Sequence, residues 1–501
     1  MYGKVYLVGA GPGDPKLITV KGLELIRKAD CIVYDRLIAP ELLAYAGENC
    51  EKIYVGKADS RHTLPQEEIN SLLVEKAKEY KNVIRLKGGD VYVFGRGGEE
   101  ALYLREHGVA FEVVPGVSSA TAGAAYAGIP VTHRGLADGF RVVTAHHREG
   151  AQEQIAFSTM TNEKETLVFL MGLSRVKEIA EGLLSAGRRK ETPVAVISHA
   201  TTPMQRTVTG NLTDIAERVS TANLTSPAMI VVGDTVTLQD GLDFMKQRPL
   251  WGRRYLVPKI GAEPSKLAEL LRKNGAYVQE RQVGRITGIP AVYTKKELEG
   301  VDVLLFTSAN AVKWFMKNLS ASGLDARALG SVRLAVIGTA TANKLQEYGL
   351  CADFMPEHYN SDILVKELKQ YMDEELRKEP FHKPVVWYPT AKNAKDDTVD
   401  ALVQICECGR LNVYENREYT DEMQEKPKLC DFDGIFFTCA SSAKRLLSGY
   451  APEELANLEQ DTAVYSIGPK CSAAITGLGI ANVTEAAVST CEGLANLVCK
   501  R

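Results

Sequence analysis

Four short apolar segments in the N-terminal half each run directly into a turn of glycine or charged residues, and no feature limits the possible fold more. The segments are residues 4–11, 31–38, 52–57 and 83–89. Stretches with apolar residues at helical spacing, such as Leu23, Ile26 and Ala29, lie between them. Strands that alternate with helices predict a mainly parallel sheet, whose ligands bind beyond the carboxyl ends of the strands. The residues expected at those ends are Gly9–Gly13, Asp35, Lys57 and Gly88–Glu99.

The stretch Arg85–Ala101, RLKGGDVYVFGRGGEEA, combines five glycines with six charged side chains. Glycine costs conformational entropy but lets the backbone adopt positive φ or approach a ligand closely. This composition is typical either of a mobile surface loop or of a ligand-binding loop. The apolar insert around Val91–Phe94 gives the loop something to bury, so we expect a functional loop.

The first turn, Gly9–Gly13, does not match the G-x-G-x-x-G fingerprint of dinucleotide sites. Pro12 also removes an N–H group that a phosphate would need. The turn therefore favours a site for a nucleoside that lacks phosphates.

Length and charge exclude several classes of protein. A chain of 501 residues is too long for one core, so two to four domains are expected. The net charge of −3 creates no field that would attract nucleic acid or an anionic membrane. The N-terminus lacks the order of a secretory signal, and no apolar run is long enough to span a membrane.

The ten cysteines contain no C-x-x-C pair, and Cys406 and Cys408 have the wrong spacing for a zinc or redox site. His133, His146 and His147 have no carboxylate or cysteine partner at a ligand spacing, so we expect no metal there. A reduced cytoplasm fits this cysteine usage best.

The rest of the chain divides into further sheet-forming regions. Several β-rich segments between residues 117 and 245 predict a second sheet-based subdomain. The polar segment Met245–Tyr255 reads as a linker between domains. Beyond it the chain is duplicated at an offset of roughly 130 residues, which predicts two similar lobes. Residues 301–316 parallel 432–447, and residues 334–350 parallel 464–480.

Each repeated unit ends an apolar strand on serine or threonine and then begins an amphipathic helix. Such side chains cap helices, which contributes about 1 kcal/mol each. Helix N-termini that open toward one cleft would also supply N–H donors for carboxylates. Both roles stay open for the residues in these turns, which are Thr307, Ser308, Thr339, Thr341, Thr438, Ser441 and Ser442.

The first half closely resembles the uroporphyrinogen-III C-methyltransferases of the tetrapyrrole methylase family, across Met1–Met245. The shared motifs, in order, are VGAGPGDP, YDRLI, VGK, KGGDVYVFGRGGEEA, VPGVSSA, GIPVTHRG, VFLMGL, TTPMQRTVTGNL and SPAMIVVGD. The resemblance implies that S-adenosylmethionine binds in a cleft between two α/β domains and that the protein is a homodimer. The implied cofactor positions are Pro12, Gly88, Gly89, Asp90, Val93, Ser118, Ser119, Met171, Ala200 and Ala228.

The same motifs imply catalytic roles. Asp35 matches the proton acceptor of the family and Lys57 the proton donor, while Arg96 and Glu99 match a pair that engages the tetrapyrrole. Methyl transfer to an electron-rich pyrrole carbon leaves a cationic ring that must lose a proton, which suits a carboxylate base. The substrate carries eight carboxylates, so Arg96 and Arg134 would have partners. A plain ion pair between Arg96 and Glu99 across the loop is the alternative.

Two positions depart from the family pattern. Val91 stands where proline is common, and Ala200 stands where glycine is common. Val91 would alter the rigidity of the loop, and Ala200 would add a methyl group close to the expected adenosine. Neither change removes the chemistry.

The second half resembles uroporphyrinogen-III synthase across about Trp251–Arg501, with looser motifs: FTSANAV, VIGTATA, YNSDIL, WYPTAKNAKDD, VYENREYT and YSIGPKCSAA. This family has two α/β lobes joined by two strands, with one lobe inserted in the other. By motif, Tyr414 helps the hydroxyl group leave and Thr341 lines the cleft of the first lobe. Lys259 and Thr390 stand where arginine is usual, and Lys470-Cys471 replace a pair of threonines. The loss of those two hydroxyls leaves the donor set of the second lobe open.

We therefore expect an α/β protein in which a two-subdomain tetrapyrrole methylase fold precedes a two-lobed uroporphyrinogen-III synthase fold. The expected domains are 1–246, with subdomains 1–116 and 117–246, a linker at 247–255, and 256–501, with lobes 256–290 plus 416–501 and 291–415. The expected substrate-binding residues are Arg134, Thr307, Ser308, Thr341, Thr438, Ser441 and Lys470.

The resemblance implies a bifunctional enzyme that cyclises hydroxymethylbilane to uroporphyrinogen III with loss of water and then methylates it at C2 and C7 to precorrin-2. One alternative makes the C-terminal half a non-catalytic tetrapyrrole-binding or regulatory module. Another makes the first half a methylase of a different corrin intermediate or of a protein side chain. The sequence does not distinguish cobalamin from sirohaem as the end product, and it does not reveal substrate channelling.

Overall fold

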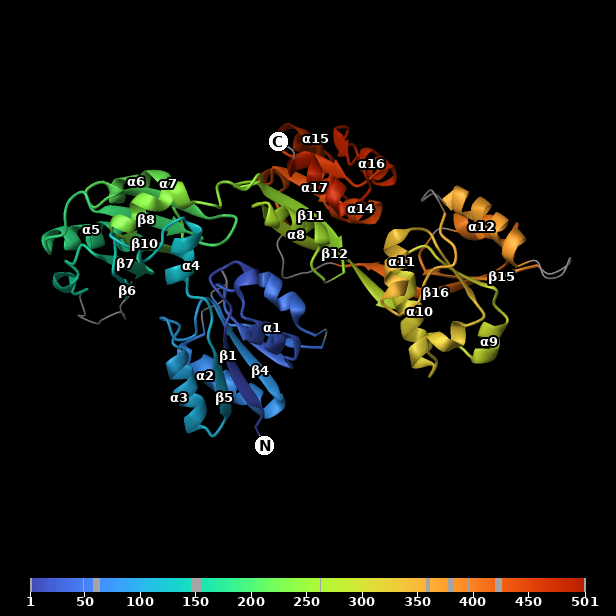
Figure 1. The fold of residues 1–501 in the computed structure, drawn as a ribbon, viewed down its shortest axis with the longest axis horizontal. Coiled ribbons are helices and arrows are strands. Elements are labelled where there is room, and N and C mark those ends of the chain that lie inside the picture. Colours follow the sequence, from blue (N-terminus) through green and yellow to red (C-terminus); the bar gives the residue numbers. More distant parts are fainter. Residues whose placement is uncertain are drawn as a thin grey trace. The chain divides into compact units, whose positions relative to one another are not determined.

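The computed structural model describes residues 2–47, 49–56, 64–145, 155–261, 263–356, 361–376, 383–394, 396–419 and 426–499. The chain divides into two compact units (Figure 1). The larger unit comprises Met1–Pro258, Ala262–Arg281 and Lys426–Arg501, and the smaller comprises Lys259–Gly261 and Gln282–Glu425. The smaller unit is therefore inserted in sequence between two parts of the larger one, as the resemblance to the synthases implies.

The first sheet of the larger unit is parallel throughout, with strand order β3-β2-β4-β1-β5. Its elements are β1 (Lys4–Gly9), α1 (Val20–Arg27), β2 (Cys31–Tyr34), β3 (Glu51–Tyr54), α2 (Gln66–Glu79), β4 (Asn82–Lys87), α3 (Gly97–Glu106) and β5 (Ala110–Val114). The alternation of apolar strands and helices predicted this sheet correctly. Because all five strands run the same way, the segments that follow β1, β2 and β4 lie at one edge.

Helices cover both faces of this sheet, α2 and α3 on one side and α1 on the other (Figure 1). Successive residues of a strand point to opposite faces. On β1, Val5 and Leu7 pack with α2 and α3, whereas Val8 packs with Ile26 of α1. Strands buried on both faces are apolar throughout, which explains why they read as short continuous apolar segments.

Glu112 on β5 makes this subdomain sensitive to acid. The carboxylate pairs with Lys21 of α1 and with Lys4 of β1, whose Nζ lies 2.6 Å from Oε2. Hydrogen bonds from Lys21 and then from Lys4 lower the pKa of Glu112 to about 2. A carboxyl group whose pKa is lower in the folded state stabilises the fold above its unfolded pKa, and this stabilisation is lost as pH falls toward the folded value.

We expect Glu112→Gln to lower the melting temperature modestly at pH 7, because both ion pairs are solvent-exposed. Thermal melts of the parent chain and the variant should converge between about pH 4.5 and 2, where the carboxylate becomes protonated. A difference that stays constant down to pH 2 would show that the ion pairs are not its source.

The second sheet of the larger unit is mixed, with order β6-β7-β10-β8-β9; only β6 and β7 are parallel neighbours. Its elements are α4 (Ser119–Tyr126), β6 (Gly139–Thr144), β7 (Glu165–Leu170), α5 (Val176–Ser185), β8 (Pro193–Ser198), β9 (Arg206–Asn211), α6 (Ile215–Ala222), β10 (Ala228–Val232) and α7 (Gln239–Leu242). Helix α4 packs on one face, and α5 and α6 on the other. The predicted second subdomain is present.

The remaining part of the larger unit is a lobe with strand order β12-β11-β17-β18-β19. Its elements are β11 (Arg254–Ile260), α8 (Lys266–Lys273), β12 (Tyr277–Gly288), β17 (Gly434–Phe437), α14 (Ala440–Leu447), α15 (Pro452–Asp461), β18 (Ala463–Ser466), α16 (Pro469–Thr476), β19 (Val483–Glu485) and α17 (Cys491–Cys499). Leu250, within the segment expected as a linker, is buried with Val257 and Leu267 in the core of this lobe.

The smaller unit has strand order β14-β13-β15-β16-β12, parallel except between β16 and β12. Its elements are α9 (Lys295–Glu299), β13 (Val303–Phe306), α10 (Ala309–Ala321), β14 (Arg333–Val336), α11 (Thr339–Gln346), α12 (Ser361–Glu375), β15 (Val385–Ala391), α13 (Asp397–Leu402) and β16 (Glu407–Glu418). The predicted duplication is confirmed, because β13-α10 and β14-α11 repeat as β17-α14 and β18-α16. In the described part of the chain, no helix is long and apolar enough to cross a membrane.

Candidate active sites

Two glycine turns meet where the adjacent strands β1 and β4 end. Gly11 and Gly89 form an antiparallel bridge, with N–H···O distances of 3.2 Å from Gly11 to Gly89 and 2.7 Å in the reverse direction. Both residues have positive φ, 84° and 68°, a backbone conformation that favours glycine. A side chain at Gly116 would lie only 2.3 Å from the carbonyl oxygen of Gly89. The two predicted turns therefore pack directly against each other, backbone to backbone.

Asp90 fixes the loop that follows Gly89. Its Oδ1 accepts hydrogen bonds from the backbone N–H groups of Tyr92 (2.8 Å) and Val93 (3.1 Å), and its Oδ2 accepts one from Gly116 (3.0 Å). All three bonds lie within the protein, so the carboxylate shapes the loop. The structure thus gives Asp90 and Val93 a shared place beside the glycine turns, with the Val93 side chain partly exposed.

The N-terminus of α4 faces the same turns. Ser118 caps this helix by accepting the N–H of Ala120 (3.3 Å). The nearest atom to a Cβ built on Gly89 is the backbone nitrogen of Ser119, at 3.9 Å. The motif residues Gly89, Ser118 and Ser119 are therefore close together, although they belong to different turns.

The second subdomain contributes strained backbone at the ends of β7 and β8. Met171, His199 and Thr201 have φ values of 58°, 48° and 67°, a backbone conformation that residues other than glycine rarely adopt. Residues in such conformations cluster at ligand sites because the surrounding structure must hold them. Ala200 lies between two of them, and Ala228 begins β10 opposite Ser198.

The loops of the two subdomains touch. A Cβ built on Gly13, next to Pro12, would lie 3.1 Å from the carbonyl oxygen of Ala200. A Cβ on Gly123 of α4 would lie 3.0 Å from the Ala200 methyl group. The implied cofactor positions of both subdomains thus border one region, with the extra methyl of Ala200 packed against α4.

A buried group of charges that the motifs did not point to lies beneath Asp35. The fully buried carboxylate of Glu100 accepts hydrogen bonds from Lys87 Nζ (2.8 Å) and Arg85 Nε (3.2 Å). Arg85 also donates from Nη2 to Asp35 Oδ2 (3.3 Å). Burial, followed by the positive charge of Arg85, lowers the pKa of the Lys87 ammonium group. The clue in the sequence was the pair of cations at alternate positions of an otherwise apolar strand.

Asp35 is held on both sides. Its Oδ1 accepts the backbone N–H of Leu37 (3.1 Å) while Oδ2 accepts Arg85, and the side chain stays partly exposed. The carboxylate is thus oriented at the edge where β2 ends. Lys57, the expected proton donor, lies outside the described residues.

Arg96 and Glu99 form a bidentate ion pair, with Nη2–Oε2 at 2.7 Å and Nε–Oε1 at 2.9 Å. Both side chains are about half exposed. Two of the five guanidinium donors are used in this pair, which leaves an edge that a carboxylate of a substrate could approach. Arg134 is also exposed, in the turns that follow α4.

The smaller unit brings hydroxyl groups from the end of β13 together with tyrosines of β15 and β16. The Ser308 hydroxyl caps α10 through the N–H of Ala311 (3.1 Å) and lies 3.2 Å from the Tyr414 hydroxyl. Thr307 Oγ1 lies 3.1 Å from the hydroxyl of Tyr388, a residue that the motifs did not single out. Thr341, in the first turn of α11, is buried. Burial raises the pKa of Tyr414, so its hydroxyl is protonated at neutral pH.

If Tyr414 has the role that the resemblance to the synthases implies, Tyr414→Phe should lower the rate of enzymatic ring closure by about 10²-fold or more, because a positioned proton donor contributes that much to loss of a leaving group. The matched control is Tyr371→Phe. The Tyr371 ring packs against Phe354 on the other face of the same sheet. The rate of type-III isomer formation from hydroxymethylbilane should fall only in Tyr414→Phe. Equal rates in both variants would remove Tyr414 from this role.

The other lobe presents different donors from those expected. The cap of α14 is the Cys439 thiol, which accepts the N–H of Ser442 (3.4 Å) and lies 3.3 Å from Ser441 Oγ. Thr438 is half-buried one residue earlier. The prediction that serine or threonine caps these helices is therefore correct for α10, which Ser308 caps. It is wrong for α14, which Cys439 caps, and for α11, whose N-cap is Gly338.

The positions that depart from the synthase pattern now have definite surroundings. Cys471 is buried against the carbonyl oxygen of Phe437, and burial raises the pKa of its thiol to about 11. Lys470, its neighbour, is exposed in the first turn of α16, so only Lys470 can serve a carboxylate. Thr390 is buried in β15, and Lys259 lies on β11.

A guanidinium does reach the loop after Thr390, but it is already used. Arg410 of β16 donates from Nη2 to the carbonyl oxygens of Ala391 (3.1 Å), Lys392 (3.2 Å) and Ala394 (3.0 Å). Its role is therefore to fold this loop. Within the residues that the structure describes, no three histidine, cysteine or carboxylate side chains are grouped to hold a metal ion.

Comparison with known families divides the chain in the same way. Residues 4–216 match the family described as Tetrapyrrole (Corrin/Porphyrin) Methylases, and residues 265–496 match the family described as Uroporphyrinogen-III synthase HemD. The two matches are consecutive and together cover most of the chain.

Two individual relatives match most of the chain, and a third matches its first half over nearly its own full length. The chain is 37% identical over 456 residues to the Porphyrin biosynthesis protein HemD of Ruminiclostridium josui, covering 89% of each protein. It is 37% identical over 404 residues to the Uroporphyrinogen-III C-methyltransferase of Bacillus subtilis, covering 80% of this chain and 82% of the relative. A Uroporphyrinogen-III C-methyltransferase of Methanocaldococcus jannaschii is 52% identical over 241 residues, covering 48% of this chain and 99% of that protein.

Proposed function

This chain belongs to the family of porphyrin-biosynthesis proteins in which a tetrapyrrole methylase is fused to a uroporphyrinogen-III synthase, and from that premise we propose that it catalyses two successive steps. The C-terminal half closes hydroxymethylbilane to uroporphyrinogen III with loss of water. The N-terminal half then methylates that product at C2 and C7 to give precorrin-2. The observation that carries the proposal is the alignment with the Ruminiclostridium josui relative, which spans both halves.

The methyl donor we propose is S-adenosylmethionine. The glycine turns at Gly11 and Gly89 lack side chains that would keep a ligand away from the backbone beside the N-terminus of α4, which suits a nucleoside, while Pro12 makes the turn unsuited to phosphate. The residues therefore fit this cofactor, with Pro12, Gly88, Gly89 and Asp90 on one wall and Met171, Ala200 and Ala228 on the other. Bound there, it would supply an electrophilic methyl group.

The chain's own residues would orient the pyrrole carbon and accept the proton that the cationic ring system loses after methylation. Asp35, held by Leu37 and Arg85, is the group that would accept this proton. Arg96 and Arg134 would bind substrate carboxylates, and most of the rate enhancement would come from holding the ring carbon in line with the methyl group.

In the synthase half the serine, threonine and tyrosine hydroxyls and the helix N-termini would bind substrate carboxylates and orient the last ring. Tyr414 would protonate the departing hydroxyl group. Fusion is useful because the product of one half is the substrate of the other, and tethering raises its local concentration.

We further propose a division into domains 1–246 and 256–501, homodimer formation through the methylase half, and action in the cytoplasm on the route to sirohaem or cobalamin. The full-length match to the Methanocaldococcus jannaschii protein supports the first boundary. All ten cysteines are free thiols, which supports a reducing compartment.

One experiment tests the sequence of reactions. The whole chain is incubated with hydroxymethylbilane, with and without S-adenosylmethionine, and the products are identified by mass and isomer analysis. We expect uroporphyrinogen III without the methyl donor and precorrin-2 with it. The spontaneous type-I isomer alone would contradict the synthase activity, and type III without methylated product would contradict the methylase activity.

A further inference from the structure

Four residues close a ring of hydrogen bonds where the two methylase subdomains meet. The Asp14 N–H donates to Thr201 Oγ1 (3.1 Å), and the Thr201 N–H donates to Gln205 Oε1 (2.8 Å). Gln205 Nε2 donates to the carbonyl oxygen of Tyr126 (3.0 Å), and the Tyr126 hydroxyl donates to Asp14 Oδ2 (2.9 Å). Asp14 belongs to the first subdomain and the other three to the second. We name this circuit the hydrogen-bond ring.

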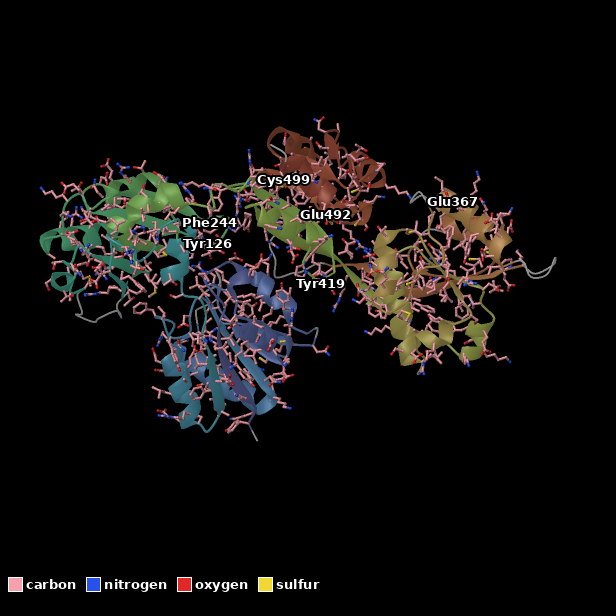
Figure 2. The ribbon with its side chains drawn as sticks, in the orientation of Figure 1. Tyr126, Phe244, Glu367, Tyr419, Glu492 and Cys499 are labelled. Carbon is pink, nitrogen blue, oxygen red and sulfur yellow. The ribbon has the colours of Figure 1, made fainter. Side chains whose placement is uncertain are left out.

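The hydrogen-bond ring is partly shielded from solvent. Thr201 and Gln205 are buried, and the Tyr126 ring packs edge-to-face against Phe244 with centroids 5.3 Å apart (Figure 2). Burial, followed by the charge of Asp14, raises the pKa of Tyr126 to about 12. The phenol therefore remains a donor throughout the neutral range. Shielded hydrogen bonds of this kind stabilise one geometry, because each lost partner leaves a polar group unsatisfied.

Thr201 shows that the hydrogen-bond ring imposes a conformation on its surroundings. Its φ of 67° is sterically unfavourable for a β-branched residue. Such strain persists only where neighbouring groups fix it. Here Gln205 accepts the Thr201 N–H while Asp14 donates to its hydroxyl, so the side chain and the backbone of Thr201 are both held.

The hydrogen-bond ring lies directly behind the proposed cofactor positions. Asp14 follows Pro12 by two residues, and Thr201 is adjacent to Ala200. A Cβ on Gly13 would lie 2.9 Å from the Thr201 hydroxyl oxygen and 3.1 Å from the Ala200 carbonyl oxygen. The loop that contains Gly13 and the loop that contains Thr201 are therefore closely packed. A change in the hydrogen-bond ring would thus alter the distance between the loops that carry Pro12 and Ala200.

We propose that the hydrogen-bond ring is a positioning device that holds the two walls of the cofactor cleft at a fixed separation. The inference rests on the proposed function, since it takes the ligand of this cleft to be S-adenosylmethionine. Asp14, Tyr126, Thr201 and Gln205 act through the loops they fix. A cleft that is already formed avoids the cost of ordering two loops at the moment of binding, which raises affinity.

The test measures the affinity of the full chain for S-adenosylhomocysteine by calorimetry. We expect Tyr126→Phe and Thr201→Val each to raise the Kd about tenfold, because each removes one partner from a partly buried hydrogen bond between the two subdomains. Thr201→Ser, which keeps the hydroxyl, should recover most of the affinity. The KM for S-adenosylmethionine should rise in both weakened variants, whereas kcat at saturating cofactor should stay within about twofold of the parent value.

Tyr450→Phe is the matched control. The Tyr450 hydroxyl is also buried, with a pKa raised to about 12, and donates to the Pro427 carbonyl oxygen at 2.7 Å in the lobe built on β17 and β18. It should leave the Kd unchanged. Unchanged affinity in Thr201→Val would overturn the proposal. Comparison of the Kd values of the two single variants Thr201→Val and Thr201→Ser tests the proposal even if Tyr126→Phe does not fold. Absence of binding in the parent chain would instead contradict the proposed cofactor.

Discussion

Asp35→Asn is expected to remove nearly all methyl transfer while the affinity for S-adenosylhomocysteine stays at the parent value. A positioned base contributes about 10²–10⁴-fold to a rate, and asparagine keeps the shape of the side chain without its basicity. The amide oxygen of the substituted side chain could still accept the Leu37 N–H, so the loop should keep its form. The measurement is the rate of uroporphyrinogen III methylation at saturating cofactor, alongside calorimetric titration with S-adenosylhomocysteine.

Asp30→Asn provides the control for this substitution. Asp30 precedes β2 at the opposite end of the sheet, where its Oδ2 accepts the backbone N–H of Asn82 (2.8 Å). Its replacement should leave methylation unchanged. Full activity in Asp35→Asn would show that another group accepts the proton, and loss of cofactor binding would show that Asp35 supports the cleft.

The sequence predicted the sheet and its glycine turns because their signals are local. A buried parallel strand reads as a short apolar segment, and Gly11 and Gly89 are required by positive φ at positions that the motifs already mark. The duplication in the second half was visible for the same reason, since each unit repeats one strand, one turn and one helix. Strand direction in the second sheet was not visible, because pairing depends on contacts between distant segments.

Contacts that no motif marks account for what the sequence did not predict at the sites. Asp90 looked like a cofactor ligand, and only its bonds to Tyr92, Val93 and Gly116 reveal how it shapes the loop. Tyr388 carries no local mark of its position beside Thr307, from which it is separated by 81 positions. The hydrogen-bond ring joins residues up to 187 positions apart, so no spacing rule would have found it.

Glu100→Gln is expected to destabilise the first subdomain strongly. Glu100 is the fully buried carboxylate that accepts hydrogen bonds from both Lys87 and Arg85. Removing one member of a buried charge group leaves the others uncompensated, which costs about 3–5 kcal/mol. Of the two cations, Asp35 is hydrogen-bonded to Arg85, so it does not replace Glu100 as the hydrogen-bond partner of Lys87. Native-state hydrogen exchange in α2, α3 and β4 would measure the loss as a lower free energy of opening.

If electrostatics makes Glu100→Gln unstable, a second substitution at Lys87 should restore part of the lost stability, whereas a packing defect would not be restored in this way. Adding Lys87→Met to Glu100→Gln removes the buried ammonium that would otherwise lack a counterion, so the double variant should be more stable than Glu100→Gln alone. If Glu100 acted only by filling space, the second substitution would add its own cost and the double variant would be less stable. Glu106→Gln, on the exposed C-terminal turn of the same helix, should change the free energy of opening by no more than about 0.5 kcal/mol. The sign of the coupling between positions 87 and 100 thus tests whether electrostatics holds together the site beneath Asp35.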